Sequence, residues 1–167
     1  MNRPSIFIWR PATTYVLIGG FVAVLIGIVG AYIANSFSFE PTRQTHIGSN
    51  VYQLQVADTE ELRQKGLSGV EALNRNGGLL MAFDSDDTWG IWMKDMEIPI
   101  DILWLDKNKK IIHLVKEADP ELSTDVIYTP DDAARYVIEL QAGQIKKAGI
   151  RKGMPVHFED YNDGQEK

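Results

Sequence analysis

Asp101 is the one ionisable side chain in an otherwise apolar segment, residues 98–105 (IPIDILWL). A buried carboxylate is costly unless it is paired, hydrogen-bonded, protonated or hydrated. The structural interpretation gives Asp101 a partner within the fold. That partner is either Lys116 or Arg135 in an ion pair, or backbone amide groups of an adjacent loop whose protons the carboxylate accepts.

The functional interpretation makes Asp101 a polar anchor at the base of a cleft walled by Trp92 and Tyr136. Hydrogen-bonding groups beside an aromatic face suit sugars and peptides. The ligand-binding candidates are Trp92, Lys94, Asp101, Arg135 and Tyr136. Asp101 is also the one weak catalytic candidate, as the acid or base of a hydrolase, because a lone carboxylate without a visible partner is poor evidence for catalysis.

The residues around Asp101 have the alternating pattern of two strands that pair as a hairpin. If residues 94–97 form a four-residue loop, Gly90 lies opposite Asp101 and leaves an empty place beside the carboxylate. The same period of two puts seven apolar side chains on one core face: Trp89, Ile91, Met93, Ile98, Ile100, Ile102 and Trp104.

Metal and cofactor sites are not expected from the motifs in this chain. The chain has no cysteine, which excludes thiolate ligands and a cysteine nucleophile. The acidic run at residues 84–87 reads as a solvated turn, because Trp89 stands where a calcium-binding loop needs glycine. His113 and His157 lack a second histidine at a metal-binding spacing. No glycine-rich phosphate-binding motif is present.

Short alternating segments separated by turn residues predict one α+β domain over residues 51–159. Strands are expected near residues 51–56, 79–83, 89–93, 98–104, 110–115, 135–140 and 154–159. Short helices are expected at residues 59–65 and 142–149. This order favours a compact, mostly antiparallel sheet or open barrel, followed by a flexible tail at residues 160–167.

Residues 15–34 are twenty uncharged, mostly apolar residues, long enough to cross a bilayer as a helix. Arg3 and Arg10 precede this segment, which keeps residues 1–14 in the cytoplasm and places everything after residue 34 outside. Residues 35–50 are polar and read as a tether. We expect a single-pass protein of the cytoplasmic membrane; the alternative is export after cleavage of a signal peptide.

Small residues recur every four positions within the expected membrane helix: Gly19, Ala23, Gly27 and Ala31. Such a stripe lets a second helix approach closely, so a homodimer is one hypothesis, although glycine and alanine are common in membrane helices. Beyond residue 34 the chain carries 15 basic and 23 acidic residues, a formal charge of −8. Binding to nucleic acid is therefore not expected.

Several motifs together resemble the uncharacterised prokaryotic family called domain of unknown function 192, over about residues 51–159. The most specific are Trp92-Met93-Lys94 and Ile98-Pro99-Ile100-Asp101-Ile102. The others are Gly66-Leu67, Gly78-Leu79-Leu80-Met81-Ala82-Phe83, Arg135-Tyr136-Val137-Ile138-Glu139-Leu140 and Gly149-Ile150-Arg151-Lys152-Gly153. The resemblance implies a compact α+β domain that is often exported or membrane-anchored. It implies no activity, because none is established for the family.

These observations favour a non-catalytic role outside the membrane. The domain would bind an envelope ligand, either a glycan or a peptide, or serve as an accessory subunit of a membrane assembly. One alternative is a hydrolase that acts on an envelope polymer through Asp101. The other is a purely structural scaffold that recruits a second membrane protein through the expected helix at residues 15–34.

Overall fold

The computed structural model describes residues 42–122 and 126–159. The expected cytoplasmic segment, membrane helix and small-residue stripe, together with the tail at residues 160–167, lie outside these ranges. Within the described ranges, no helix is both long enough and apolar enough to cross a bilayer.

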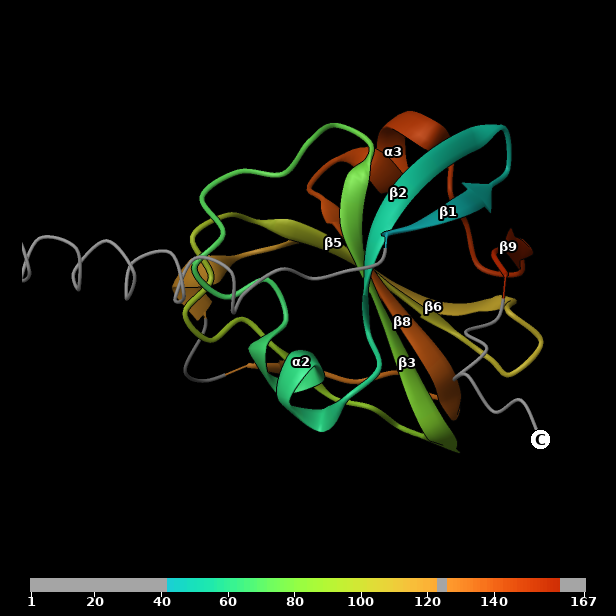
Figure 1. The fold of residues 1–167 in the computed structure, drawn as a ribbon, viewed down its shortest axis with the longest axis horizontal. Coiled ribbons are helices and arrows are strands. Elements are labelled where there is room, and N and C mark those ends of the chain that lie inside the picture. The colour runs from blue at the N-terminus through green and yellow to red at the C-terminus, as the bar shows by residue number, and fades with distance from the viewer. Residues whose placement is uncertain (1–41, 123–125, 160–167) are drawn as a thin grey trace, which may run out of the picture. The chain divides into compact units, whose positions relative to one another are not determined.

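Nine strands and two short α-helices make up the described domain (Figure 1). The elements in chain order are β1 (Thr42–Ile47), β2 (Asn50–Ala57), α2 (Glu60–Lys65), β3 (Gly77–Asp87), β4 (Ile91–Trp92), β5 (Ile100–Leu105), β6 (Ile111–Ala118), a 3-10 turn (Pro120–Leu122), β7 (Ile127–Tyr128), β8 (Ala134–Gln141), α3 (Gln144–Ala148) and β9 (Val156–His157).

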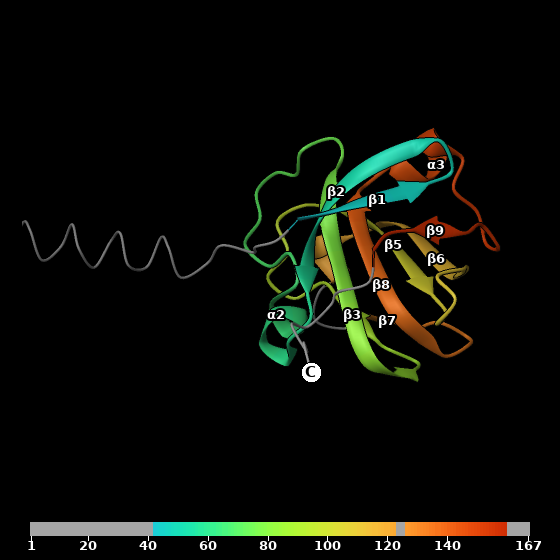
Figure 2. The same ribbon diagram turned by 45° about the vertical axis from the view of Figure 1, so that its right-hand side comes forward.

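Seven strands form one sheet in the order β6-β5-β8-β3-β2-β1-β9, and β4 pairs with β7 in a separate ribbon. All neighbours in the large sheet are antiparallel except β2 and β3, which run parallel and are connected through α2. A bridge between Lys110 and Pro155 joins the residues just before β6 and β9, so the two ends of the sheet meet and the sheet curls (Figure 2). The expected fold of mostly antiparallel strands with two short helices is confirmed.

The curled sheet has a hydrophobic core on each face. One core gathers buried residues from β1, β2, β3, β5, β6, β8 and β9 together with Ile145 of α3. The other includes the expected apolar face of Ile91, Met93, Ile100, Ile102 and Trp104. All six residues of β5 are buried, because β5 lies between β6 and β8 and is covered on both sides.

The expected hairpin between residues 89–93 and 98–104 is wrong. Ile91 and Trp92 pair with Tyr128 and Ile127 of β7, and β5 pairs with β6 and β8 instead. Both edges of β5 are therefore occupied, which leaves no hydrogen-bonding edge for β4. Gly90 consequently does not lie across from Asp101; a Cβ atom there would be 2.7 Å from Ile127 Cγ2.

The expected tether at residues 35–50 includes a strand of the domain. Residues 42–47 form β1 and pair along their whole length with β2. Thr45 and Ile47 are fully buried, while Gln44 and His46, which alternate with them, are exposed. This alternation is that of a strand with one face on the core, but its polar composition hides the signal in the sequence.

Asp101 is fully buried and its carboxylate accepts two backbone hydrogen bonds. The amide of Glu117 in β6 donates to Oδ1 at 2.8 Å, and the amide of Ile145 in α3 donates to Oδ2 at 2.6 Å. The residue before α3 is Gly143, which has no side chain that could cap the helix. Asp101 therefore satisfies one of the free amide groups at the start of this helix, which is the structural interpretation of this residue.

Asp101→Asn should lower the free energy of unfolding by about 2–4 kcal/mol, because an amide side chain lacks the charge and loses one of two acceptor oxygens. Urea unfolding followed by circular dichroism measures the change. Asp106→Asn is the matched control: Asp106 also accepts two backbone amides, from Asn108 and Lys110, but in an exposed turn. Equal losses in the two variants would contradict a special role for the buried carboxylate.

Candidate functional site

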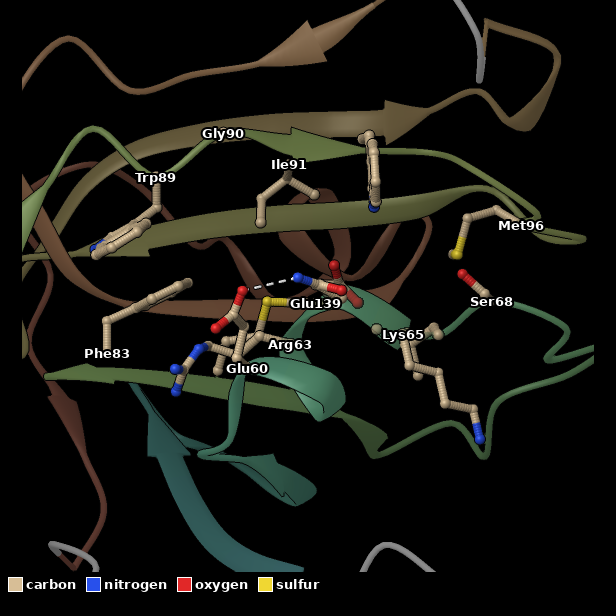
Figure 3. A pocket seen from close by; sticks show the side chains of 15 residues that line it. Glu60, Arg63, Lys65, Ser68, Phe83, Trp89, Gly90, Ile91, Met96 and Glu139 are labelled. Atoms are coloured by element: carbon tan, nitrogen blue, oxygen red, sulfur yellow. Dashed lines mark hydrogen bonds between the residues drawn. The ribbon is translucent and has the colours of Figure 1, made fainter. Parts of the chain in front are cut away.

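A pocket of about 520 Å³ opens between α2, the end of β3 and the segment that carries β4. Its wall includes Glu60, Arg63 and Lys65 of α2, the Gly66-Leu67-Ser68 loop, Met81 and Phe83 of β3, residues 89–92, Met96, and Glu139 of β8. Figure 3 shows Phe83 and Trp89 toward one end and Ser68 and Met96 toward the other, with Glu139 between them. The lining is mostly aromatic, aliphatic and thioether groups, as in many ligand sites.

Glu139 is the buried carboxyl group of this pocket. It is 3% exposed, and its Oε2 atom has no hydrogen-bond partner within the described residues. Burial alone raises the pKa of Glu139 from 4.5 to about 8, because the charged form has lost its hydration and no cation compensates. At neutral pH the group is therefore mostly an uncharged carboxylic acid, which both donates and accepts a hydrogen bond.

Strand pairing fixes the direction in which Glu139 points. Glu139 lies opposite Leu79 of β3 and Ile102 of β5, and it shares its face of β8 with Val137. Leu79, Ile102 and Val137 all belong to the core behind the pocket. The carboxyl group thus projects from the buried part of β8 into the pocket.

Gly66 brings backbone close to the carboxyl group. It ends α2 with φ of +51°, a region that residues with a side chain rarely adopt. A Cβ atom there would lie 3.8 Å from Glu139 Oε2 and 3.4 Å from Met81 Cε. The sequence therefore needs glycine here both to end the helix and to keep the space beside Glu139 open.

Aromatic rings form another part of the wall. The rings of Phe83 and Trp89 stack with centroids 4.1 Å apart and planes 9° from parallel. The indole of Trp104 donates to the backbone oxygen of Trp89 at 2.8 Å, which ties this part of the wall to the core. Trp92 is 48% exposed, with Lys94 Nζ 5.5 Å from its ring centre. Phe83 and Trp89 are thus held in place, and Trp92 offers free ring surface.

Arg63 does not neutralise Glu139, although both line the pocket. Its Nη1 donates to the backbone oxygens of Asp58 at 2.6 Å and Ala82 at 2.7 Å. Its guanidinium lies 5.1 Å from the centre of the Phe83 ring. Arg63 therefore positions α2 on β3 and supports the aromatic wall.

The five residues predicted as ligand contacts do not come together in one cleft. Trp92 lines the pocket and has Lys94 beside it, whereas Asp101 is in the core on the opposite face of the sheet. Arg135 donates to Asp86 at 2.7 Å in a partly exposed ion pair. Tyr136 packs edge-on against Phe158 beside a different hollow.

Glu139 is the residue that reasoning from the sequence did not single out as a site. Its signal is nevertheless present, because a glutamate interrupts the apolar run of RYVIEL at a position that shares the core face with Val137. What the sequence does not reveal is which of the two carboxyl groups, Asp101 or Glu139, finds partners in the fold.

The family model DUF192, described as "Uncharacterized ACR", matches residues 42–158. The chain belongs to this family. The match starts at Thr42, the first residue of β1. It therefore agrees with the structure, in which the domain begins before the expected residue 51. The resemblance noted from the sequence motifs is confirmed, and DUF192 membership brings no activity with it.

Relatives in archaea carry a similarly uninformative name. A UPF0127 protein of Thermococcus gammatolerans is 28% identical over 114 residues, covering 68% of this chain and 71% of the relative. A UPF0127 protein of Thermococcus kodakarensis is 28% identical over 101 residues, covering 60% of this chain; the chain spans 61% of that relative's length.

Two crystal structures share the DUF192 fold seen here. One, from Sinorhizobium meliloti 1021, is of a proposed transcription regulator; its TM-score is 0.67 at 22% identity, covering 71% of this chain and 94% of that one. The other, of unknown function, is from Novosphingobium aromaticivorans; its TM-score is 0.62 at 20% identity, covering 70% and 83%. At such low identity the likeness supports the fold alone.

Stability should depend on pH through Glu139. Because the pKa is raised in the folded state, the native protein binds more protons than the unfolded chain between pH 4.5 and 8. The contribution of Glu139 to the free energy of unfolding is therefore most favourable below pH 4.5. It falls by at most about 5 kcal/mol as the pH rises to about 8. Comparing the free energies of unfolding of wild type and Glu139→Gln across this range isolates the effect.

Glu139→Gln keeps the shape of the side chain but cannot titrate, so its stability should lose this pH dependence. Its free energy of unfolding should therefore rise relative to that of the wild type as the pH approaches 8. Glu60→Gln serves as the control, since Glu60 is an exposed carboxylate of the same pocket. Wild-type and Glu139→Gln curves that stay parallel from pH 4.5 to 8 would show that Glu139 is not a buried acid.

Proposed function

We propose that this protein is a non-catalytic binding protein, whose domain is held outside the cytoplasmic membrane and takes an envelope ligand in the pocket around Glu139. The ligand is a peptide or a glycan. The peptide can also be a segment of a partner protein, in which case this protein is an accessory subunit of a membrane assembly. The observation that carries the proposal is the combination of an open, mostly apolar pocket with one buried carboxyl group that lacks a partner. Such a group supplies orientation and specificity, while the apolar wall supplies affinity.

Catalysis has less support than binding. The hydrolase alternative requires Asp101 to contact a substrate, but Asp101 has no exposed surface and both its oxygens accept backbone amides. Within the pocket, the side-chain hydroxyl of Ser68 donates to the Lys94 backbone oxygen, so no base activates it as a nucleophile. A pocket whose one buried carboxyl group, Glu139, has no activated nucleophile beside it among the described residues suits recognition better than bond cleavage.

Placement outside the membrane rests on the sequence. Residues 15–34 are uncharged and long enough to span, and the basic residues Arg3 and Arg10 precede them. The formal charge of −8 beyond the span argues against binding to nucleic acid. Neither a cofactor nor a metal ion is part of the proposal.

Fusing alkaline phosphatase to the C-terminus should give an active enzyme in a bacterial host, because this reporter needs disulfides that form outside the cytoplasm. Membrane fractionation should find the fusion in the membrane pellet. In the control, Leu25→Arg with Ile26→Arg places two charges in the span, each costing about 2.5–3.5 kcal/mol at its centre. High reporter activity only from a cytoplasmic fluorescent-protein fusion would refute the orientation.

Trp92→Ala should weaken ligand binding about tenfold or more, since exposed aromatic residues often dominate binding energy. The measurement is isothermal titration of the full-length protein with peptides and glycan fragments prepared from envelope material. His157→Ala is the control, because His157 is exposed beside a separate hollow. A ligand that binds both variants equally would put the binding site outside this pocket.

A further inference from the structure

The buried polar side chains of the described residues are Thr45, Asp101, Glu139 and Gln144, and Glu139 alone among them lines the pocket. We propose that the ligand is an uncharged, apolar polypeptide segment, and that one of its backbone carbonyl groups accepts a hydrogen bond from the Glu139 carboxyl group. This inference rests on the proposed function, because it names the ligand class of the same pocket.

The chemistry of the group favours a donor role. Oε2 of Glu139 has no partner in the described residues, and the neighbouring cation Arg63 is engaged with backbone oxygens and the Phe83 ring. An unpaired acid in an apolar wall stays protonated, so its hydroxyl group is the donor on offer. A peptide carbonyl is a strong acceptor, and the carboxyl C=O remains free to accept from a peptide N–H.

The surrounding charges disfavour a charged ligand. The pocket-facing ionisable groups of α2 are Glu60, Arg63 and Lys65, and Lys94 lies near Trp92. The residues of β3 and β5 opposite Glu139 are Leu79 and Ile102, and β4 contributes Ile91 and Trp92, none of which titrates. A cationic ligand would be repelled by three basic side chains, and only one exposed carboxylate, Glu60, would attract it. An anionic ligand would have to place its charge beside the carboxyl group of Glu139.

The surface beyond the pocket favours a polypeptide over a glycan. Trp92 and Ile127 pair across the β4–β7 ribbon. Within residues 42–122 and 126–159 they are the two large hydrophobic side chains that are exposed, at 48% and 65%. Trp92 lines the pocket, so apolar surface continues from the pocket onto the ribbon. A glycan needs many polar partners, whereas an extended chain of apolar residues can fill the pocket and cover this pair.

The test uses full-length protein and a library of N-acetylated, C-amidated hexapeptides built from Leu, Phe, Val, Ala and Gly. The best binder is then titrated calorimetrically between pH 6 and 9. If only the protonated acid binds, affinity is constant up to about pH 7 and about tenfold weaker at pH 9. Glu139→Gln should bind with little pH dependence, because its amide N–H replaces the acid as donor. Glu71→Gln should behave as wild type, because Glu71 is exposed and does not line the pocket.

Each other outcome has a distinct meaning. Affinity that rises with pH, or tighter binding of a lysine-containing version of the same peptide, would overturn the inference in favour of a cation site. Binding of neutral chitooligosaccharides that depends on Trp92, without binding of any peptide, would overturn it while the proposed function stands. Failure of peptides, chitooligosaccharides and envelope extracts alike to bind would overturn both. The wild-type pH profile is decisive even if Glu139→Gln folds poorly.

Discussion

The arrangement of this domain depends on two central strands, β5 and β8, that are buried on both faces. Each carries one carboxyl group into a region with little water: Asp101 from β5 and Glu139 from β8. In register, Asp101 lies opposite Leu140 and Glu139 opposite Ile102, so the two groups are neighbours on opposite faces of the sheet. The fold satisfies one of them and leaves the other open.

Asp101 shows which hydrogen bonds a buried carboxylate needs. Its two oxygens bind amides from β6 and α3, which are 16 and 44 residues away in the chain, and it thereby joins three elements around one charge. Burial and, secondarily, the nearby Asp101 carboxylate raise the pKa of the Tyr52 hydroxyl. The Asp101 carboxylate thus influences a neighbouring buried side chain, and its two backbone hydrogen bonds compensate for the cost of burying it.

The sequence predicts local faces well and long-range pairing poorly. The shared core face of Ile91, Met93, Ile100, Ile102 and Trp104 follows from the period of two, which needs no knowledge of the partner strand. The pairing of β4 with β7 joins residues 35 or more positions apart, and the neighbouring sequence carries no signal of it. In the turn that follows β4, Asp95 has φ of +56°, an unusual conformation for a residue with a side chain.

The sequence predicts only part of the candidate site, because long-range pairing decides the rest. The residue type and position of both carboxyl groups can be read from the sequence, but whether each is partnered depends on distant segments. The sequence predicts Trp92 as the aromatic wall of a cleft with Asp101 at its base, but Trp92 lines a pocket with Glu139 and not with Asp101. The expected hairpin paired the strand of Trp92 with that of Asp101, whereas β4 pairs with β7 and Trp92 lines the same pocket as Glu139.

An unpartnered acid at Glu139 has a physical cost that the fold does not need to bear. Val137 and Ile102 around it are apolar, and an apolar side chain at the same position would complete that core without the desolvation of a carboxyl group. The cost grows as pH approaches the raised pKa of about 8, so it is present near neutral pH. Glu139 thus lowers stability, lines an open pocket and has an Oε2 atom without a partner among the described residues, and these three properties are the basis of the proposal that a ligand supplies the missing hydrogen bond.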